Sequence, residues 1–370
     1  MLQFDIVPDP GPSHEYLDWW YQHGRRFLSP ELILGDPRAA TIPAKAIDRG
    51  PGRVLDMDQL PDVPNNRRVA RRQRLGHDLA SPNRNLLVRK LDPPQTWNPM
   101  VENYLRATGF FHVSRIGIIR GFHPMLAALV ERWRPETHSF VLPIGEVTVT
   151  LEDVAHIFGL PIDGKPVSGW TYSSSDFVQS QGIAIFGRQP SVSHNVKSYI
   201  KLGWVRRIRD AEPLDTEESI RRYVRCHIFC LLGSTLFTDK STAYTHAKYL
   251  PLLRDFEQIH TYSWGAACLA HLYRALCRAS RYDTKEMDGP LNLLFVWAWE
   301  RMPCLAPVPR QTLPPAEIPV ARRWSHSERT TAWLSKTVET FRHDIDYMQE
   351  DFLFLSVPHK QAMSRDLPMV

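Results

Sequence analysis

Two cysteines and a histidine in the second half of the chain have the residue types of a metal site. Cys226, His227 and Cys230 lie close together, and Cys268 and His271 form a similar pair further along. A structural zinc site commonly has four ligands with tight loop spacings such as C-x-x-C, and no such spacing is present. The cysteines stand among large apolar residues, where a thiol behaves as a small buried hydrophobe. We therefore expect core cysteines, and we expect no metal or cofactor.

Three histidines lie near carboxylates in the first half of the chain and could be imagined as acid–base pairs. The histidines are His123, His138 and His156, and the carboxylates are Glu131, Glu136, Glu146, Glu152 and Asp153. None of their spacings is one that general acid–base chemistry specifically requires. Neither G-x-x-x-x-G-K-[ST] nor a strand-linked G-x-G-x-x-G, the motifs that cradle phosphates, is present. We predict structural polar contacts for these side chains and no catalytic residues.

One cluster of positive charge lies between residues 67 and 74, where RRVARRQR carries five arginines and no acidic residue, although the net charge is only +5. Arginines neutralise phosphates without reading a base sequence, and short basic runs also serve as nuclear-import signals. Three interpretations stay open: an import signal, a nucleic-acid contact, or a solvated basic linker. The five residues are Arg67, Arg68, Arg71, Arg72 and Arg74.

Length and composition indicate a folded chain. Its 370 residues are 43% hydrophobic, enough for a large core, and the length gives two domains as a soft prior. Five cysteines are an odd number without a dense disulfide pattern, which favours a reducing compartment. The longest strongly apolar run, 291–299, is shorter than the ~20 residues that span a bilayer, and the N-terminus lacks a signal-peptide pattern. We predict neither secretion nor membrane insertion.

The elements that would position these residues are clearest between residues 120 and 170. Apolar residues from Met125 to Trp133 recur at helical spacing, which predicts a helix that ends at Pro135. Runs 138–142 and 146–150 flank a Pro-Ile-Gly turn and predict an antiparallel hairpin. Thr150 and Asp153 then have the spacing of a capping box. The helix that follows would bury Leu151, Val154, Ile157 and Phe158 and end at Gly159.

A string of polar residues connects the first helix to the hairpin, and its side chains must satisfy their hydrogen bonds. This polar string consists of Arg132, Arg134, Glu136, Thr137 and His138. We predict that Glu136 pairs with an arginine and fixes the angle between helix and hairpin, so that Glu136→Ala would lower the melting temperature. Gly145, Gly159 and Gly164 are predicted to be turn or helix-end residues with positive φ.

The remainder is predicted to be mainly helical. We expect helices at 220–232, 264–281, 291–301 and 330–348, a helix at 196–207, and an irregular region over most of 171–215. The fold class is therefore mainly α, a multi-helix globular domain with one small antiparallel β-hairpin near 138–150. The predicted organisation is an aromatic, amphipathic segment at 1–48, a basic proline-rich linker at 49–95, the main domain at 96–356 and a tail at 357–370.

Several blocks of this sequence, in order, resemble the plant mobile domain, also called the aminotransferase-like plant mobile domain. They are ERWRPETHSF, LPIGEVTVTLEDVAHIFGLPIDGKPVSG, LPLLRD, YSWGAACLAHLYRALCRASR and GPLNLLFVWAWERMP, within residues 96–356. We expect structural roles for the residues that carry the resemblance. They are Trp133, Arg134, Pro135, Glu136, Thr137, His138, Gly145, Glu146, Asp153, Gly159, Leu160, Pro161, Gly164, Trp264, Gly265, Trp297, Trp299 and Glu300.

The resemblance implies a function for the chain. The family includes nuclear proteins of transposon silencing and meristem maintenance, homologues of a phosphatase long form, and copies within transposable elements. It implies a non-enzymatic nuclear interaction module with roles in transposon silencing, gene-expression control, genome integrity and meristem maintenance, and a protein partner such as a phosphatase-like nuclear protein. The alternative is a transposable-element-encoded protein with residual nucleic-acid-binding or transposase-related activity.

The family names also suggest enzymes, which the motifs do not support. No lysine has the context of a Schiff-base site, and no clustered Asp, His and Asn ligands of a metallophosphatase are present. Family members commonly continue with further apolar segments beyond the position of Phe352–Leu355. If the domain is C-terminally incomplete, we expect apolar faces of its last helices to be exposed or covered by a partner.

Overall fold

The computed structural model describes residues 97–169, 175–190, 198–239, 243–281, 284, 287–309, 319–325 and 327–348. These residues all lie in one compact unit that spans Asn66–Val370. The predictions for 1–48, for the linker with its arginine run and for the tail at 357–370 lie outside the described residues.

Short helices and a small sheet make up the first part of the described chain. The helices are α5 (Pro99–Ala107), α6 (Phe111–Ser114), α7 (His123–Val130) and α8 (Leu151–Phe158), and the strands are β1 (Trp133–Arg134), β2 (Ser139–Leu142) and β3 (Gly145–Val147). The sheet is antiparallel in the order β1-β2-β3, with Phe140 opposite both Trp133 and Val147. The predicted hairpin is therefore confirmed, with a third strand added.

The third strand exists because α7 ends earlier than predicted. The helix stops at Val130 rather than near Pro135, and Trp133 belongs to β1. The Arg132 carbonyl accepts a hydrogen bond from the Val141 amide at 2.9 Å, so this part of the chain joins the sheet. Apolar spacing cannot distinguish a last helical turn from a two-residue strand that buries the same tryptophan.

The capping box at the start of α8 is confirmed. The Thr150 hydroxyl accepts from the Asp153 amide, the Asp153 carboxylate accepts from the Thr150 amide, and Gly159 ends the helix with φ of 63°. Leu151, predicted to be buried, is 38% exposed, whereas Asp153 is 4% exposed. The Asp153 carboxylate can lie on the buried face of α8 because it is paired with Arg301 there.

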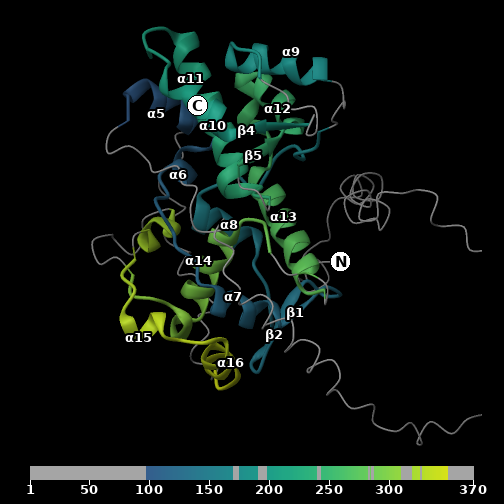
Figure 1. The fold of residues 1–370 in the computed structure, drawn as a ribbon, viewed down its shortest axis with the longest axis vertical. Coiled ribbons are helices and arrows are strands. Elements are labelled where there is room, and N and C mark those ends of the chain that lie inside the picture. Colours follow the sequence, from purple (N-terminus) through teal and green to yellow (C-terminus); the bar gives the residue numbers. More distant parts are fainter. Residues whose placement is uncertain are drawn as a thin grey trace, which may run out of the picture. The chain divides into compact units, whose positions relative to one another are not determined.

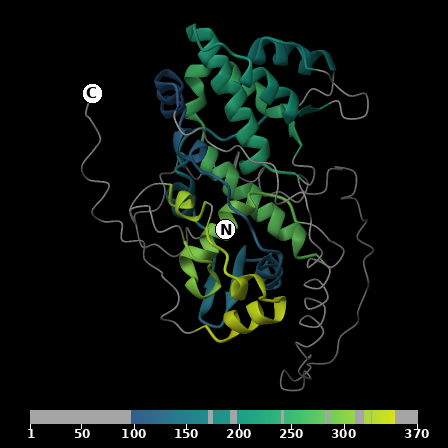
Figure 2. The same ribbon diagram turned by 60° about the vertical axis from the view of Figure 1, so that its left-hand side comes forward.

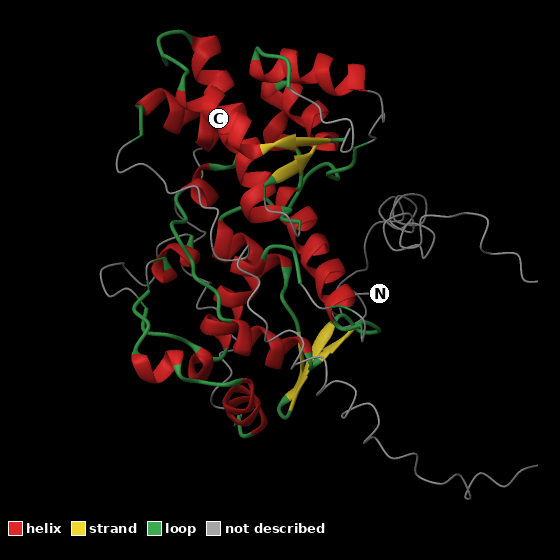
Figure 3. Cartoon of the chain, viewed as in Figure 1, coloured by secondary structure: helices red, strands yellow, loops and turns green. Residues whose placement is uncertain are grey.

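The second part of the chain is mainly helical, which confirms the predicted fold class (Figure 3). Its helices are α9 (Ser175–Phe186), α10 (Leu202–Asp210), α11 (Glu217–Leu231), α12 (Leu250–Arg254), α13 (Trp264–Ala279), α14 (Leu291–Arg301), α15 (Thr331–Leu334) and α16 (Val338–Asp346). Strands β4 (Tyr199–Lys201) and β5 (Tyr244–His246) form a separate antiparallel pair. The short helical turns include η4 (Leu232–Leu236), η5 (Ala247–Tyr249), η6 (Phe256–Thr261), η7 (Pro303–Leu305) and η8 (Val320–Trp324).

The helix predictions for 220–232, 264–281 and 291–301 are confirmed by α11, α13 and α14. The single helix predicted at 330–348 is wrong, because Thr337 caps a new helix after α15 and Leu334 is 46% exposed. The predicted helix at 196–207 is shifted, since β4 precedes α10 and α10 continues to Asp210. Helix α9 lies in the region predicted to be irregular.

Helices α9 to α12 lie with β4 and β5 at one end of this unit, whereas α7, α14 to α16 and the three-stranded sheet lie at the other (Figures 1 and 2). The long helix α13 runs between them, and α14 is buried along almost its whole length. Among the described residues, no helix is both long and apolar enough to cross a membrane.

Candidate functional site

Two of the sequence blocks that carry the family resemblance, the turn after α8 and the start of α13, are joined by backbone hydrogen bonds. The Gly265 amide donates to the Pro161 carbonyl at 2.8 Å, and Lys165 exchanges backbone hydrogen bonds with Thr261 and Ser263. A Cβ at Gly164, where φ is 119°, would lie 2.4 Å from the Thr261 carbonyl oxygen. Positive φ at Gly145, Gly159 and Gly164 is confirmed, and at Gly164 the close approach itself requires glycine.

Aromatic residues join the sheet to α13 and α14. The buried Trp133 packs edge-on against Phe140, which stacks on Trp297 with ring centroids 5.2 Å apart. His138 has a φ of 52°, uncommon for a residue other than glycine, and stacks on Tyr273 with ring planes 11° apart. Burial of its ring lowers the pKa of His138. These contacts agree with a structural role for Trp133 and His138.

The polar string between α7 and β2 has a different partner from the one predicted. Glu136 is exposed and has no ion pair in the described part of the chain, so the predicted Glu136–arginine pair is wrong. Glu131 makes the pair instead, accepting two hydrogen bonds from Arg342 of α16 at 2.6 and 2.7 Å. The other exposed members are Arg134 and Thr137. Helix α7 therefore docks on α16 through Glu131 at its C-terminal end, whereas Glu136 lies beyond the helix.

A network on β2 and β3 fixes Glu146. The Ser139 hydroxyl donates to the Glu146 carboxylate at 2.5 Å, and the Thr137 hydroxyl lies 2.6 Å from that of Ser139. Hydrogen bonding from Ser139 and then Thr137 lowers the pKa of Glu146. The polar contact predicted for His123 is not seen at its Nε2, which is buried and has no hydrogen-bond partner among the described residues. Burial accordingly lowers the pKa of His123.

A pocket of about 440 Å³ lies where α8, the C-terminal end of α14, η7 and η8 meet. Three tryptophans and three prolines dominate its wall, together with two carboxylates and two arginines. The lining residues are Asp153, His156, Ile157, Trp297, Trp299, Glu300, Arg301, Pro303, Ala306, Pro307, Pro309, Arg323 and Trp324. The structure therefore brings together five residues singled out in the sequence, Asp153, His156, Trp297, Trp299 and Glu300.

The Asp153 carboxylate is fully engaged in internal contacts. One oxygen accepts from the amide and hydroxyl of Thr150 at the start of α8, and the other accepts from Arg301 at the end of α14. Its side chain is only 5% exposed. The pair therefore joins two helices that are far apart in the sequence, and no lone pair of Asp153 is left exposed as a ready general base.

Glu300 is held in a comparable way. Its carboxylate accepts a hydrogen bond from Trp324 Nε1 at 2.5 Å and lies 3.7 Å from the Arg323 guanidinium. Glu300 thus attaches η8 to the end of α14. The two carboxylates and two arginines of the pocket form two ion pairs, so these four side chains contribute no net charge.

The aromatic wall of the pocket is continuous with the core. Trp299 stacks on Phe295 with ring planes 19° apart, and it also contacts Trp324, whose ring centroid lies 5.2 Å away. Trp299 is 1% exposed, and its Nε1 has no acceptor among the residues that the structure describes. The lining of the pocket is therefore largely aromatic and apolar, and it also contains the titratable side chain of His156. Apolar, aromatic linings are typical of binding pockets.

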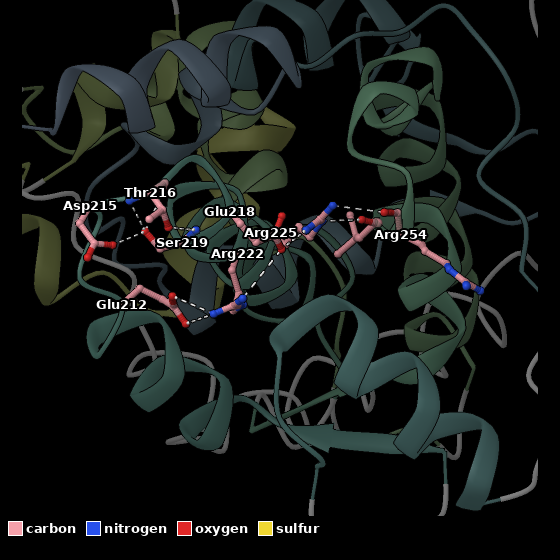
Figure 4. A network of polar contacts seen from close by, with 9 residues as sticks. Glu212, Asp215, Thr216, Glu218, Ser219, Arg222, Arg225 and Arg254 are labelled. Atoms are coloured by element: carbon pink, nitrogen blue, oxygen red, sulfur yellow. Dashed lines mark hydrogen bonds and ion pairs between the residues drawn. The ribbon is translucent and has the colours of Figure 1, made fainter.

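A second polar network lies at the opposite end of the unit, on α11 (Figure 4). Arg225 donates to the carbonyls of Leu253 and Arg254 at the end of α12 and contacts Glu218, while Arg222 pairs with Glu212. Thr216 and Ser219 form the capping box of α11. Arg225 is 8% exposed. From its place on α11, Arg225 provides hydrogen-bond donors for the last carbonyl groups of α12, which is a structural role.

The core location of Cys226, Cys230 and Cys268 is confirmed, while Cys277 and Cys304 are half-buried. Burial raises the pKa of all five thiols. His227 is also buried, accepts from Arg209 at its Nδ1, and has its pKa lowered to about 3, mainly by burial and further by Arg209. Within the described ranges, no cluster of three or more His, Cys, Asp or Glu residues is placed to hold a metal ion.

Sequence reasoning missed Arg301, Arg323, Trp324 and the prolines of the pocket wall. Arg301 lies within the block GPLNLLFVWAWERMP, directly after Glu300, and its place at a helix C-terminus is a usable signal. Trp324 follows a proline-rich connection with no periodic pattern. Only the packing of η8 against α14 assigns it to the pocket.

Known proteins resemble this chain in sequence. From Arabidopsis thaliana, "Protein MAIN-LIKE 2" is 35% identical over 261 residues, covering 70% of this chain and 38% of that protein. "Serine/threonine-protein phosphatase 7 long form homolog" is 40% identical over 207 residues, covering 55% and 15%. "Protein MAINTENANCE OF MERISTEMS" is 34% identical over 195 residues, covering 52% and 40%. The chain thus spans less than half the length of each of these relatives.

No solved structure shows significant similarity to the chain. The family model described as "Plant mobile domain" matches residues 109–367, which is most of the sequence and includes the whole described pocket. The chain belongs to the plant mobile domain family.

Proposed function

We propose that this chain is a non-enzymatic protein-interaction module that acts in the nucleus. The observation that carries the proposal is the state of the pocket between α8, α14 and η8. Its carboxylates are both engaged in internal ion pairs and hydrogen bonds, while its wall is made largely of tryptophan and proline. A catalytic carboxylate must be able to exchange a proton with a substrate, and these two are held in internal contacts instead. His156 is the other titratable acid–base side chain in the lining. A recognition pocket needs an apolar surface with a few fixed polar groups, which this one has.

The family relationship supplies the proposed setting. Among the relatives are proteins named for meristem maintenance and for a phosphatase long form. We propose roles in transposon silencing, gene-expression control, genome integrity and meristem maintenance, carried out through a protein partner of the phosphatase-like kind. Import into the nucleus would use the arginines between 67 and 74.

That same arginine run favours the second candidate, a transposable-element-encoded protein with residual nucleic-acid binding or transposase-related activity. Binding that depends on phosphate neutralisation weakens steeply with salt, whereas association through an apolar pocket does not. Salt dependence therefore separates the two candidates.

The test is a tagged pull-down from plant nuclei followed by mass spectrometry, with washes at low and high salt. The unaltered chain is compared with a variant in which the five arginines are glutamine, and with Ala306→Phe, which places a ring in the pocket. The module predicts nuclear proteins that persist at high salt and disappear with Ala306→Phe. Recovery of nucleic acid that is lost at high salt and with the glutamine variant would support the second candidate. Recovery of chaperones alone would overturn the module.

A further inference from the structure

We infer that Lys248 and Arg274, together with the hydroxyl of Tyr249, form a binding site for the phosphate group of a phosphorylated serine or threonine in a partner protein. Lys248 and Tyr249 belong to η5, and Arg274 belongs to α13. None of the three lines the pocket. The inference therefore goes beyond the proposed function and does not depend on what the pocket binds.

Aromatic contacts place η5 against α13. Tyr249 stacks on Phe237 with ring centroids 4.8 Å apart, and Phe237 packs edge-on against His271 of α13, whose centroid is 5.8 Å away. Arg274 follows His271 by three residues, so the two are neighbours on the surface of that helix. Lys248 Nζ lies 5.0 Å from the centroid of the Tyr249 ring. The two cations thus come from different elements that meet at Tyr249.

The two cations lack a counter-ion among the described residues. Neither Lys248 Nζ nor the Arg274 guanidinium forms an ion pair or a hydrogen bond there, whereas Asp288, in the connection between α13 and α14, is paired with Arg278 at 2.6 Å. Lys248 is half-buried, and burial, followed by the positive charge of Arg274, lowers the pKa of its ammonium group. A carboxylate beside the ammonium would raise that pKa. A bound anion would relieve the repulsion between the two cations.

The Tyr249 hydroxyl adds a neutral donor. The residue is 9% exposed, and its hydroxyl forms no hydrogen bond with any described residue. Burial raises the pKa of Tyr249, so the hydroxyl keeps its proton at neutral pH. Polar groups at buried positions nearly always have a partner. The ammonium and guanidinium groups have donors and no acceptor, so a ligand with several acceptor oxygens suits this set.

The other titratable groups near the site leave it positive. Mainly through burial, the pKa of His246 is lowered to about 4 and that of His271 is also lowered, so both rings are neutral at pH 7. The carboxylate of Asp239 raises the pKa of Tyr199, after the larger effect of burial, whereas the charge that acts on Lys248 is the guanidinium. The site therefore has a net positive charge at neutral pH.

A phosphate monoester matches this site better than other anions. A phosphorylated serine or threonine carries roughly −1.5 to −2 charges at pH 7 and has strong acceptor oxygens, which suit two cations and a hydroxyl donor. A carboxylate brings a single charge. A nucleic acid gains its affinity from many basic contacts along its backbone rather than from one pair of cations.

The test is a binding measurement on the purified full chain. The probe is a fluorescein-labelled, end-capped peptide of glycine and alanine with one central phosphoserine, and fluorescence anisotropy gives Kd. The same peptide with serine tests the need for the phosphate, and the same peptide with glutamate tests a single negative charge. We expect the phosphoserine peptide to bind at least about tenfold more tightly than either control.

Charge-removing variants assign the binding to the site. Lys248→Gln and Arg274→Gln each remove one cation and should weaken binding about fivefold to tenfold, because each loses a charge-assisted hydrogen bond. Tyr249→Phe removes only the hydroxyl and should weaken binding about threefold. Lys201→Gln, at an exposed position on β4, is the matched control and should change Kd by less than about twofold. The variant with glutamine at the five arginines and Ala306→Phe in the pocket should both leave Kd unchanged.

Equal affinity for the phosphoserine and serine peptides would overturn the inference. So would an unchanged Kd in both Lys248→Gln and Arg274→Gln, or an equal loss in Lys201→Gln, which would indicate diffuse attraction by the surface. Circular dichroism checks folding, and the exposed Arg274 still provides a test if Lys248→Gln does not fold.

Two competitors distinguish the sources of phosphate. An unlabelled phosphoserine peptide should displace the probe at a concentration at least about tenfold lower than inorganic phosphate does. Equal displacement by inorganic phosphate would overturn the phosphoprotein ligand in favour of free phosphate. Oligothymidylate that binds more tightly than the phosphopeptide and is weakened by Lys248→Gln would overturn it in favour of nucleic acid. Pocket-dependent nuclear partners without phosphopeptide binding would leave the interaction module standing and this inference wrong.

Discussion

Buried polar groups are used differently at the two ends of the described unit. Around α11, Arg225 and His227 are buried against backbone carbonyls and neighbouring side chains. Around α8 and α14, ion pairs join elements that are distant in sequence and leave a cavity of about 440 Å³.

The network around α11 therefore stabilises the fold, whereas the region around α8 and α14 also offers a cavity to a ligand. A buried arginine that caps a helix end contributes to stability and leaves nothing for a ligand to contact. The pairs at the pocket also hold helices together, but they leave a cavity whose lining includes three tryptophans. We therefore expect substitutions around α11 to change stability, and substitutions of the less buried lining residues, such as Pro303 and Ala306, to change binding first.

The largest effect on stability is expected for Arg225→Ala. The substitution leaves the carbonyls of Leu253 and Arg254 without their donor in a buried region (Figure 4). Unsatisfied buried acceptors cost about 1–3 kcal/mol each, so the free energy of unfolding should fall by about 3 kcal/mol. Urea denaturation measures it. Arg207→Ala, an exposed position on α10, is the control and should change stability by less than about 0.5 kcal/mol. Equal effects of the two substitutions would contradict the role of Arg225.

A smaller effect is expected from the pH dependence that His227 confers. Its pKa is about 3 in the folded state and 6.5 in the unfolded chain, so the unfolded chain binds more protons between these values. The contribution is fully present above pH 6.5 and is lost as the pH falls, by about 2 kcal/mol at pH 5. His227→Gln keeps an acceptor for Arg209 but does not titrate. Urea denaturation of both proteins at pH 7 and 5 should show a smaller loss in the variant, and parallel losses would count against this assignment.

The smallest effect is expected for the ion pair that docks α7 on α16. Glu131 and Arg342 have side chains that are 8% and 19% exposed and share two hydrogen bonds. A double-mutant cycle with alanine at both positions should give a coupling energy of about 1 kcal/mol. Glu136→Ala is the control within the same polar string and should change stability by less than about 0.5 kcal/mol. A Glu136→Ala protein as unstable as Glu131→Ala would restore the pairing predicted from sequence alone.

Much of the local structure was predictable from sequence. The capping box of Thr150 and Asp153, the positive φ of Gly159 and the bounds of α14 follow from residues that interact within a few positions. Several of the incorrect predictions concern the boundaries between neighbouring elements. At the start of β1 a strand replaces the predicted helical turn and buries the same Trp133, whereas the break between α15 and α16 leaves Leu334 46% exposed.

The pocket was only partly predictable. Asp153, Trp297, Trp299 and Glu300 were marked by sequence resemblance, but nothing in their spacing indicated that they line one cavity. The basic run at 67–74 and the domain bounds stay predictions, since the structure does not describe those parts of the chain or test those bounds.

Sequence by itself therefore determined the long helices α11, α13 and α14, the capping box of α8 and the small hairpin, because backbone hydrogen bonds and apolar periodicity act over short separations. Tertiary structure alone decided which partner each charged side chain has. Asp153 meets Arg301, 148 residues away, and Glu131 rather than Glu136 meets Arg342. Such pairs form where packed helices bring side chains within hydrogen-bond distance. The apolar packing that sets those distances belongs to the whole unit rather than to any one segment.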